Sequence, residues 1–361
     1  MARALVLEGP RTLRLRDEAP PRLGPRDVRV RTLVSGISHG TELNLYRGGS
    51  AFADSVFDRG LRAFVRPDPP RSTYPSPLGY ELVGVVEDVG PAVDELRRGD
   101  LVHAGAPHAE EVVLDLDAAS AATYPLVSLP AVAPPEDWLF LSLGAVALVA
   151  VHDAGIRLGD RVTVVGLGAI GLLAVQMARL AGATRVAAVD PVPARRALAL
   201  DLGADEALDP AEGPVGERLK RAQGRGADVS IETSGNTAGL HDAIAATGLG
   251  GRVVTVGFYQ GGAPELRLGE EWHHNRLDMV SSMGAWGAPH RAYPAWDRPR
   301  VMATVVELLA SRRVQVDRLP VRRFSFDEVV EAYRWLDAHP HEAVKVALTY
   351  DGRHPAGGGE Q

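Results

Sequence analysis

Cysteine is absent from this 361-residue chain, and its absence removes two kinds of structure. Without thiols no disulfide framework can form, and no zinc site can be built on thiolates. Dense runs of Lys and Arg are also missing, and the formal net charge is -7. The sequence therefore offers no basic surface for a polyanion, and we expect no nucleic-acid partner.

Long apolar runs are scarce as well. The most apolar stretch, Leu139 to Val151, falls short of the roughly 20 residues that cross a bilayer, and charged residues flank it. The first residues lead directly into a strand-like pattern, without the apolar core and cleavage site of a secretory signal. We therefore expect a cytoplasmic protein with no membrane partner.

Two sequence patterns divide the chain, which is long enough for two domains. The first part has short apolar strands broken by Gly and Pro turns, as at Val28–Val34 and Gly79–Val89, which is typical of a small barrel. Beyond about residue 151, strands alternate with helices, which predicts an α/β domain with a parallel sheet covered on both faces. Near the end, Ser325 followed by Glu328 predicts a capped helix start.

A glycine-rich turn follows the first strand of the alternating region. Gly166, Gly168 and Gly171 fit the pattern G-x-G-x-x-G. The first glycine makes a tight turn, the second lets a pyrophosphate approach, and the third allows close packing of helix on strand. The helix that begins near Ala169 and Ile170 would point its free N–H groups at the phosphates. The sequence therefore predicts a dinucleotide site, the alternative being a glycine-rich turn without a cofactor.

An acidic residue ends the next strand. Asp190 lies about 20 residues beyond the glycines, where a carboxylate accepts hydrogen bonds from the adenosine ribose and repels a 2′-phosphate. Arg195 and Arg196 complicate this interpretation, because a guanidinium can accommodate that phosphate; alternatively, both lie on a solvated helix surface. The pattern favours NAD over NADP, with Arg195 as a further cofactor contact.

Four segments resemble the medium-chain dehydrogenase/reductase superfamily. They are Gly36–Glu42, Leu78–Val86, Glu232–Gly235 and Gly251–Gly257. The likeness is greatest to the zinc-type alcohol dehydrogenase homologues of the bacteriochlorophyllide dehydrogenase-like branch. It implies a GroES-like β-barrel catalytic domain of residues 1–150 and 288–361, and a Rossmann doubly wound domain of residues 151–287. It also implies a homodimer or homotetramer.

The same resemblance implies that residues after two strands of the Rossmann domain lie along the nicotinamide half of the cofactor. These residues are Thr233, Ser234, Val256 and Gly257.

The family's zinc ligands are not plainly present. If Thr41 and Glu42 are placed on the family's Thr-Asp pair, His39 falls on the position of the ligand Cys, and Tyr80 occupies that of the ligand His. A phenol with a pKa of about 10 is a poor zinc ligand. We therefore expect a metal-free site.

A rearranged zinc site is the alternative. It would use His39 and Glu81 with a third ligand such as His103 or His152. Ordinary packing or surface roles are the simpler interpretation for those last two histidines and for His108.

Without zinc, a hydrogen-bond donor must polarise the carbonyl group. Tyr80 is the first candidate and His39, as a proton relay, the second. Thr41 would pass the proton onward, and Glu81 or Glu42 would orient Tyr80 or His39. Tyr80 as a packing aromatic and His39 as a capped loop residue are the alternatives.

The predicted activity is therefore a nicotinamide-dependent oxidoreductase that interconverts a small-molecule secondary alcohol and a ketone. A zinc-free quinone or enone reductase and a non-catalytic dinucleotide-binding protein are the alternatives.

Overall fold

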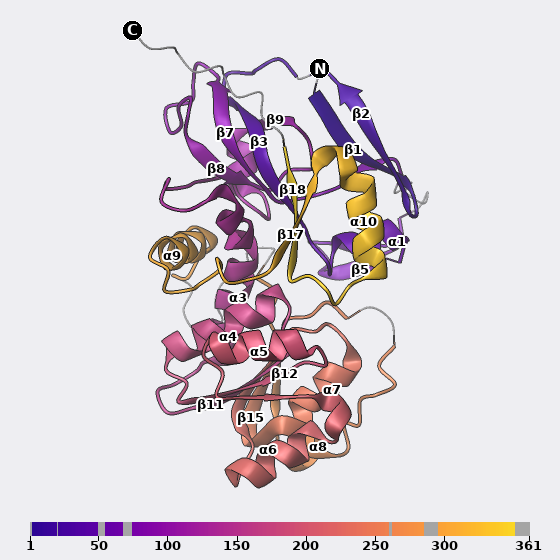
Figure 1. Ribbon diagram of the computed structural model, residues 1–361, viewed down its shortest axis with the longest axis vertical. Helices are drawn as coiled ribbons and strands as arrows, with labels where there is room; N and C mark the ends of the chain where they lie inside the picture. The colour runs from indigo at the N-terminus through magenta and orange to yellow at the C-terminus, as the bar shows by residue number, and fades with distance from the viewer. Residues whose placement is uncertain are drawn as a thin grey trace. The chain divides into compact units, whose positions relative to one another are not determined.

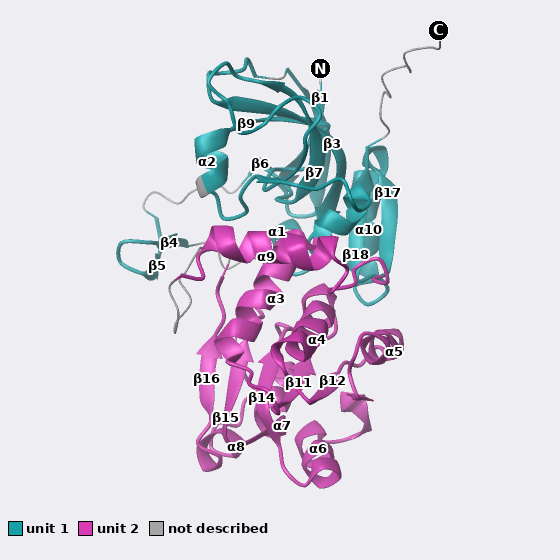
Figure 2. Cartoon of the chain, turned by 90° about the vertical axis from the view of Figure 1, so that its left-hand side faces the viewer, with its two compact units in different colours: residues 1–139, 320–361 teal, residues 140–319 magenta. Residues whose placement is uncertain are grey.

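The computed structural model describes residues 2–19, 21–49, 55–67, 74–259, 262–284 and 295–350. Contacts divide the chain into two compact units, coloured separately in Figure 2. Unit 1 comprises Met1–Leu139 and Pro320–Gln361, and unit 2 comprises Phe140–Leu319.

Unit 1 contains a 7-stranded sheet, a 3-stranded sheet and a 2-stranded sheet. The large sheet has the order β10-β8-β7-β3-β18-β17, with β9 paired to β3. Its strands are β3 (Asp27–Ile37), β7 (Leu82–Val89), β8 (Leu101–Ala104), β9 (Glu111–Asp115), β10 (Val127–Ser128), β17 (Val321–Ser325) and β18 (Lys345–Thr349). The small sheets contain β1 (Ala2–Gly9), β2 (Thr12–Glu18) and β6 (Ser76–Pro77), and β4 (Val56–Asp58) with β5 (Ala63–Val65).

The long strand β3 follows from its alternating sequence. Val28, Val30, Thr32 and Val34 are buried, whereas the residues between them are partly exposed. This period of two is the signature of a strand with one face on a core. Val28 and Val30 pack with Leu82 and its neighbours in a core of this unit.

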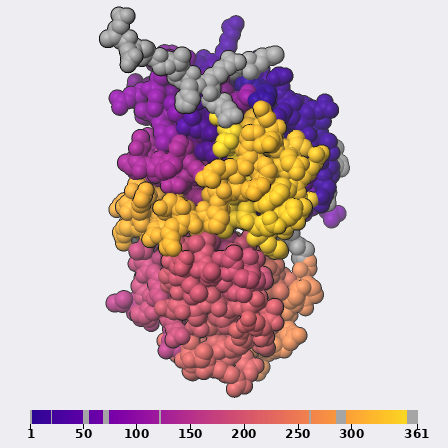
Figure 3. Space-filling view, viewed as in Figure 1, coloured from indigo at the N-terminus to yellow at the C-terminus, as the bar shows by residue number. Residues whose placement is uncertain are grey.

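Five short helices lie in the described part of unit 1 or end at its border. They are α1 (Glu42–Arg47), α2 (Leu116–Ala121), η1 (Pro135–Phe140), η3 (Phe326–Glu328) and α10 (Val329–Ala338). The predicted start at Ser325 is confirmed, since Ser325 N and Oγ donate to Glu328 Oε2 at 3.0 and 2.9 Å. Val329, Tyr333 and Leu336 of α10 are buried with Leu5 of β1, so the two ends of the unit share a core. In Figure 3 the yellow surface of this late segment adjoins the indigo surface of the first strands.

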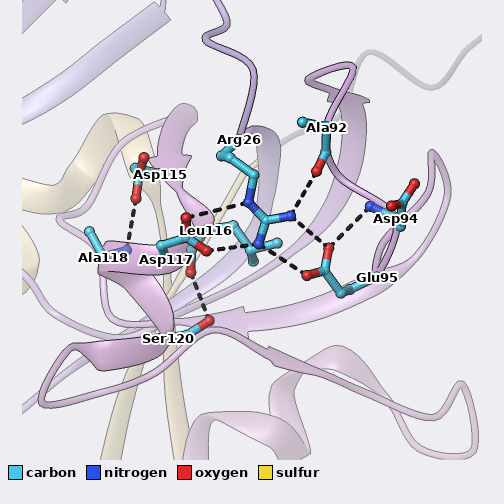
Figure 4. Close-up of polar contacts among 9 residues, drawn as sticks. All are labelled: Arg26, Ala92, Asp94, Glu95, Asp115, Leu116, Asp117, Ala118 and Ser120. Carbon is cyan, nitrogen blue, oxygen red and sulfur yellow. Dashed lines mark hydrogen bonds and ion pairs between the residues drawn. The ribbon is translucent and has the colours of Figure 1, made fainter.

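A partly exposed arginine joins three segments near the start of β3. Arg26 donates to Ala92 O at 2.7 Å and forms ion pairs with Glu95 at 3.0 Å and Asp117 at 2.7 Å, as Figure 4 shows. The two carboxylates raise the pKa of the guanidinium. Because solvent screens exposed pairs of this kind, they fix loop positions more than they add stability.

Unit 2 has a 6-stranded sheet in the order β13-β12-β11-β14-β15-β16, and all pairs are parallel. The strands are β11 (Arg161–Val165), β12 (Arg185–Val189), β13 (Glu206–Leu208), β14 (Ala227–Glu232), β15 (Thr247–Thr255) and β16 (Asp278–Ser281). The helices are α3 (Leu141–Ala154), α4 (Ala169–Ala181), α5 (Pro193–Asp201), η2 (Pro210–Glu212), α6 (Val215–Gln223), α7 (Thr237–Ala246), α8 (Glu271–His274) and α9 (Arg298–Ala310).

This sheet confirms the predicted Rossmann domain. Counted along the chain, its order is 3-2-1-4-5-6, and the order reverses between β11 and β14. Figure 1 shows helices on both sides of the sheet, with α4 and α5 above it and α6 and α8 below. Val162, Thr163, Val164 and Val165 are all buried, and since successive side chains point to opposite faces, the strand is covered on both faces.

The borders of the units differ from the predicted domain limits. We expected residues up to 150 and from 288 in the barrel domain, but the units divide at 139/140 and 319/320. The reason is packing, because α3 contacts α4 and α9 and so belongs to unit 2. The helical stretch Pro135–Ala154 has 20 residues and extends beyond the apolar run Leu139 to Val151. It is long enough to cross a membrane, but 61% of its most apolar window is buried, as in a core helix.

Candidate functional site

The three glycines of the turn after β11 have three different surroundings. Gly166 has φ +88°, and a Cβ there would lie 2.6 Å from Ser234 N. At Gly171 a Cβ would lie 1.8 Å from Gly166 O, so only glycine lets α4 approach the strand. At Gly168, which caps α4, a Cβ would meet nothing within 4 Å. The turn thus has open space at the middle glycine, in front of the amides of Ala169 and Ile170.

Asp190 follows β12 directly and is buried. Its Oδ2 accepts a hydrogen bond from Leu167 N at 2.7 Å, and its Oδ1 accepts one from Val192 N at 2.8 Å. A carboxylate has about four acceptor positions, so the backbone contacts leave capacity for hydroxyl donors. The structure therefore brings the predicted acid against the predicted glycine turn.

The two arginines beyond Asp190 differ in their contacts. Arg196 donates to the backbone oxygens of Asp190 and Pro191 at 2.7 and 2.9 Å and pairs with Asp209 at 3.0 Å. Arg195 is partly buried, and burial lowers its pKa although Asp190 opposes that shift. The guanidinium group of Arg196 is thus occupied by contacts within unit 2.

The turn after β14 packs on the glycine turn. Thr233 Oγ1 donates to Gly166 O at 2.6 Å, and Thr233 N donates to Val165 O at 2.8 Å. A Cβ on Gly257 would lie 2.3 Å from Gly235 Cα, so the loops after β14 and β15 meet backbone to backbone. The predicted residues Thr233, Ser234, Val256 and Gly257 therefore border one end of the sheet.

Sequence reasoning missed a buried carboxylate at the same place. Glu232 ends β14, and its Oε1 accepts hydrogen bonds from Ser234 N at 2.6 Å and Gly235 N at 3.2 Å. Its Oε2 accepts one from the hydroxyl of Tyr259. Burial raises the pKa of Glu232, and the donors from Ser234 and Tyr259 act against that shift. Two signals were available: Glu232 begins the segment Glu232–Gly235 that resembles the superfamily, and it is an acid at the end of a buried strand.

These residues fit a dinucleotide. A cradle of backbone amides opens onto free space at Gly168, and an acid with spare acceptor capacity lies beside it. The phosphates would meet the start of α4, and the adenosine ribose would meet Asp190.

In unit 1 Tyr80 stacks on a second tyrosine. The rings of Tyr80 and Tyr124 are 4.5 Å apart and inclined by 16°. Tyr80 is hydrogen-bonded to Ser38 and to Tyr124. Burial raises the pKa of Tyr80 well above its ordinary value and that of Tyr124 to about 12. Both phenols thus keep their protons near neutral pH and can donate hydrogen bonds.

The partners Ser38 and Tyr124 were not predicted. Ser38 precedes His39, the residue that the motif alignment had selected, and nothing in the sequence singles out Tyr124. His39 lies partly buried in the loop after β3, and Thr41 is exposed at the start of α1, where its side chain makes no capping hydrogen bond.

Glu81, the residue that follows Tyr80, forms a buried ion pair with Lys345. Its Oε2 lies 2.5 Å from Lys345 Nζ, and the side chains are 0% and 1% exposed. Burial raises the pKa of Glu81, although the ammonium group of Lys345 acts in the opposite direction. A Cβ on Gly36 would lie 2.7 Å from Lys345 Nζ, so the glycine of β3 makes room for the pair.

Glu42 belongs to a second buried network. Its Oε1 accepts from Ser38 N at 2.8 Å, and its Oε2 accepts from the hydroxyl of Tyr333 and lies 3.0 Å from His108 Nε2. The network continues from His108 Nδ1 to Ser35 Oγ at 2.8 Å, and from there to the hydroxyl of Tyr350 at 2.8 Å.

A carboxylate only accepts hydrogen bonds, and this fixes the direction of the network. For a neutral His108 the donors run from Tyr350 through Ser35 and His108 to Glu42. We expected Glu42 to orient Tyr80 or His39; the structure shows it holding the backbone of Ser38, the hydrogen-bond partner of Tyr80.

The donor set of unit 1 does not fit catalytic zinc. Such a site takes three protein ligands. Among the described residues, no three His, Asp or Glu side chains gather as metal ligands would. At the positions that the resemblance selects, Tyr80 keeps its proton and Glu81 is paired with Lys345. Of the two suggested third ligands, His152 belongs to unit 2 and packs on Trp296 with ring centres 4.3 Å apart, and burial lowers the pKa of His103 to about 4.

Comparisons with known proteins agree with the two units. Residues 24–113 match the alcohol dehydrogenase GroES-like domain, and residues 169–298 match the zinc-binding dehydrogenase family. The chain is 33% identical to D-guloside 3-dehydrogenase of Escherichia coli (strain K12) over 96% of its length and 99% of that protein. It is 30% identical to (R,R)-butanediol dehydrogenase of Bacillus subtilis (strain 168), over 88% of this chain and 91% of that one.

Solved structures show the same fold. A 2R,3R-butanediol dehydrogenase from Bacillus subtilis matches with a TM-score of 0.78 at 24% identity, over 97% of this chain and 99% of that one. A zinc-binding dehydrogenase from Sinorhizobium meliloti 1021, bound to NADP, matches with a TM-score of 0.77 at 25% identity, over 97% and 99%.

Proposed function

We propose that this chain, which belongs to the zinc-type alcohol dehydrogenase family of medium-chain dehydrogenases/reductases, interconverts a secondary alcohol of a polyol or sugar and the matching ketone with NAD. The observation that carries the proposal is the open amide cradle at Gly168 with Asp190 beside it. The substrate class is inferred from relatives that are named for a guloside and a butanediol. Likeness to the bacteriochlorophyllide dehydrogenase-like branch rests on the sequence motifs alone.

The choice of NAD over NADP rests on charge. The Asp190 carboxylate would repel a 2′-phosphate, and Arg196 is occupied by two backbone oxygens and by Asp209. Arg195 would contact the adenosine side of the cofactor. A relative of known structure was bound to NADP, so the cofactor has to be measured for this chain.

When bound, the nicotinamide supplies or accepts the hydride. Tyr80 donates a hydrogen bond, and then a proton, to the carbonyl oxygen that is being reduced, with Ser38 and Tyr124 fixing its hydroxyl group. His39 and Thr41 return the proton from solvent, and Glu81 helps to hold the segment before β7 that carries Tyr80. We propose a metal-free site because the donor set lacks three zinc ligands.

The proposal extends to a cytoplasmic homodimer or homotetramer. Support comes from β16, the last strand of the sheet in the described part of unit 2, whose Met279 is 42% exposed.

The test combines binding and turnover. Calorimetry with NAD⁺ and NADP⁺ should show tighter binding of NAD⁺, and NADH should be oxidised with hydroxyketones or ketoses. Tyr80→Phe should lower turnover by about 100-fold or more while cofactor affinity is unchanged, because a positioned general acid contributes about 10²–10⁴-fold. Tyr46→Phe, at another buried tyrosine of unit 1, is the matched control.

Three results would contradict the proposal. Turnover with quinones or enones and NADPH, but with no ketone, would indicate a reductase of the zinc-free kind. Cofactor binding without any turnover would indicate a non-catalytic protein. Stoichiometric zinc whose removal abolishes turnover would overturn the metal-free site.

A further inference from the structure

Glu232 is a buried carboxylate that is surrounded by neutral donors. It is 0% exposed, and within the described residues no Lys, Arg or His forms an ion pair with it. The amides of Ser234 and Gly235 and the hydroxyl groups of Ser234 and Tyr259 donate to it instead. Hydrogen bonds of this kind hold a charge in place without cancelling it, whereas the Glu81 charge is neutralised by Lys345.

The position of this charge in the sheet is fixed by register. Glu232 pairs with Val165, the residue before the glycine turn, and with Thr255 on the other side. It therefore lies at the carboxyl end of the sheet, next to the point where the strand order reverses and where doubly wound folds bind their ligands.

Close backbone contacts leave this carboxylate directly behind the loops of the cofactor site. A Cβ on Gly257 would lie 3.1 Å from Glu232 Oε2, and one on Gly239 would lie 3.3 Å from Oε1. Glu232 Oε1 holds the turn of Ser234 and Gly235, and Oε2 holds the loop that carries Tyr259. One buried charge thus ties together both loops that we assign to the nicotinamide half.

The two redox forms of the cofactor differ in charge at that half. The oxidised nicotinamide ring carries a positive charge, and the reduced ring carries none. A fixed negative charge in a low-dielectric environment stabilises the first form and is nearly indifferent to the second. We propose that Glu232 is a positioning residue that makes the site prefer NAD⁺ over NADH; this inference rests on the proposed function.

Ionisation of Glu232 gives the preference a pH dependence. Burial raises the pKa of this carboxyl, and the donors from Ser234, Gly235 and Tyr259, which face it from the two loops, oppose the shift. The preference is therefore present above that pKa, where Glu232 is charged, and is lost as the pH falls through it. Tyr259→Phe removes one donor to the charged form and moves this loss to higher pH.

The experiment compares the affinities of the full chain for NAD⁺ and NADH by calorimetry over a pH series. Glu232→Gln should lower the ratio of the NADH to the NAD⁺ dissociation constant about tenfold, which is about 1.4 kcal/mol. Asp228→Asn is the matched control. It lies on the same strand at the opposite end, accepts a hydrogen bond from Arg161 N at 2.9 Å, and should leave the ratio unchanged.

A merely structural role predicts a different result. If Glu232→Gln weakens both forms equally, the inference is overturned although the proposed function stands. If Glu232→Gln does not fold, Tyr259→Phe provides the test. If the ratio of its NADH to NAD⁺ dissociation constants changes with pH as in the wild type, the inference is also overturned. If the wild type binds neither form, the proposed function itself has failed.

Discussion

Replacing Lys345 by Met removes the cation of the buried ion pair and leaves its carboxylate in place. Lys345 Nζ lies 2.5 Å from Glu81 Oε2, and both side chains are at most 1% exposed. The other oxygen of Glu81 has no hydrogen-bond partner among the described residues. Lys345→Met therefore buries an uncompensated charge.

The expected loss of stability is large. Breaking a buried pair by removing one partner costs about 3–5 kcal/mol, compared with about 5–15 kcal/mol for the whole stability of a typical domain. For a unit of this size about 1 kcal/mol shifts the melting temperature by about 2–4 °C, so a fall of roughly 10 °C is expected.

The loss should depend on pH with a definite sign. Burial already raises the pKa of Glu81, and removal of the ammonium group raises it further. A carboxyl group whose folded pKa exceeds its unfolded value, about 4.3, favours the folded state by binding a proton. The destabilisation by Lys345→Met is therefore smallest near that value and grows as the pH rises through the folded pKa.

Urea unfolding of the variant between about pH 4.5 and pH 8 measures this slope. The double variant Glu81→Gln with Lys345→Met should recover most of the lost stability, because no charge is then buried. Lys220→Met, on α6 of the other unit, is the control for loss of a lysine. A destabilisation that is the same at every pH, or a double variant no more stable than the single one, would refute the reasoning.

The cofactor end of unit 2 was predictable from the sequence. A tight turn, close packing of a helix on a strand and an acid at a strand end each require particular residues at nearby positions. These requirements produce a local sequence pattern. Gly166, Gly171 and Asp190 lie where that pattern predicts. The capped helix start at Ser325 was predictable for the same reason, since its capping partner Glu328 is only three residues away.

The polar networks of unit 1 were not predictable. Glu42 meets a histidine 66 residues away and a tyrosine 291 residues away, so only the folded barrel brings them together. Motif alignment selected His39, but in the folded barrel its neighbour Ser38 is the hydrogen-bond partner of Tyr80. Sequence spacing alone does not determine which residue of a loop faces inward.

The border of the units shows a similar limit. The apolar sequence of α3 predicts a buried helix, but apolarity does not say which core buries it. Contacts with α4 and α9 decide that question, and these contacts join residues far apart in the chain.

Two pairs of substitutions, one pair in each unit, test the glycine turn and the Glu42 network. Gly171→Ala drives a methyl group to 1.8 Å from a backbone oxygen, so we expect a loss of about 1–3 kcal/mol in urea unfolding and weaker dinucleotide binding in calorimetry; Gly262→Ala, whose Cβ meets nothing within 4 Å, should be neutral. Tyr333→Phe leaves the buried Glu42 carboxylate one donor short, which costs about 1–3 kcal/mol. Tyr350→Phe removes a hydrogen bond to a neutral hydroxyl at the far end of the same network and should cost only about 0.5–1.5 kcal/mol. Equal losses from the two tyrosine substitutions would contradict this reasoning.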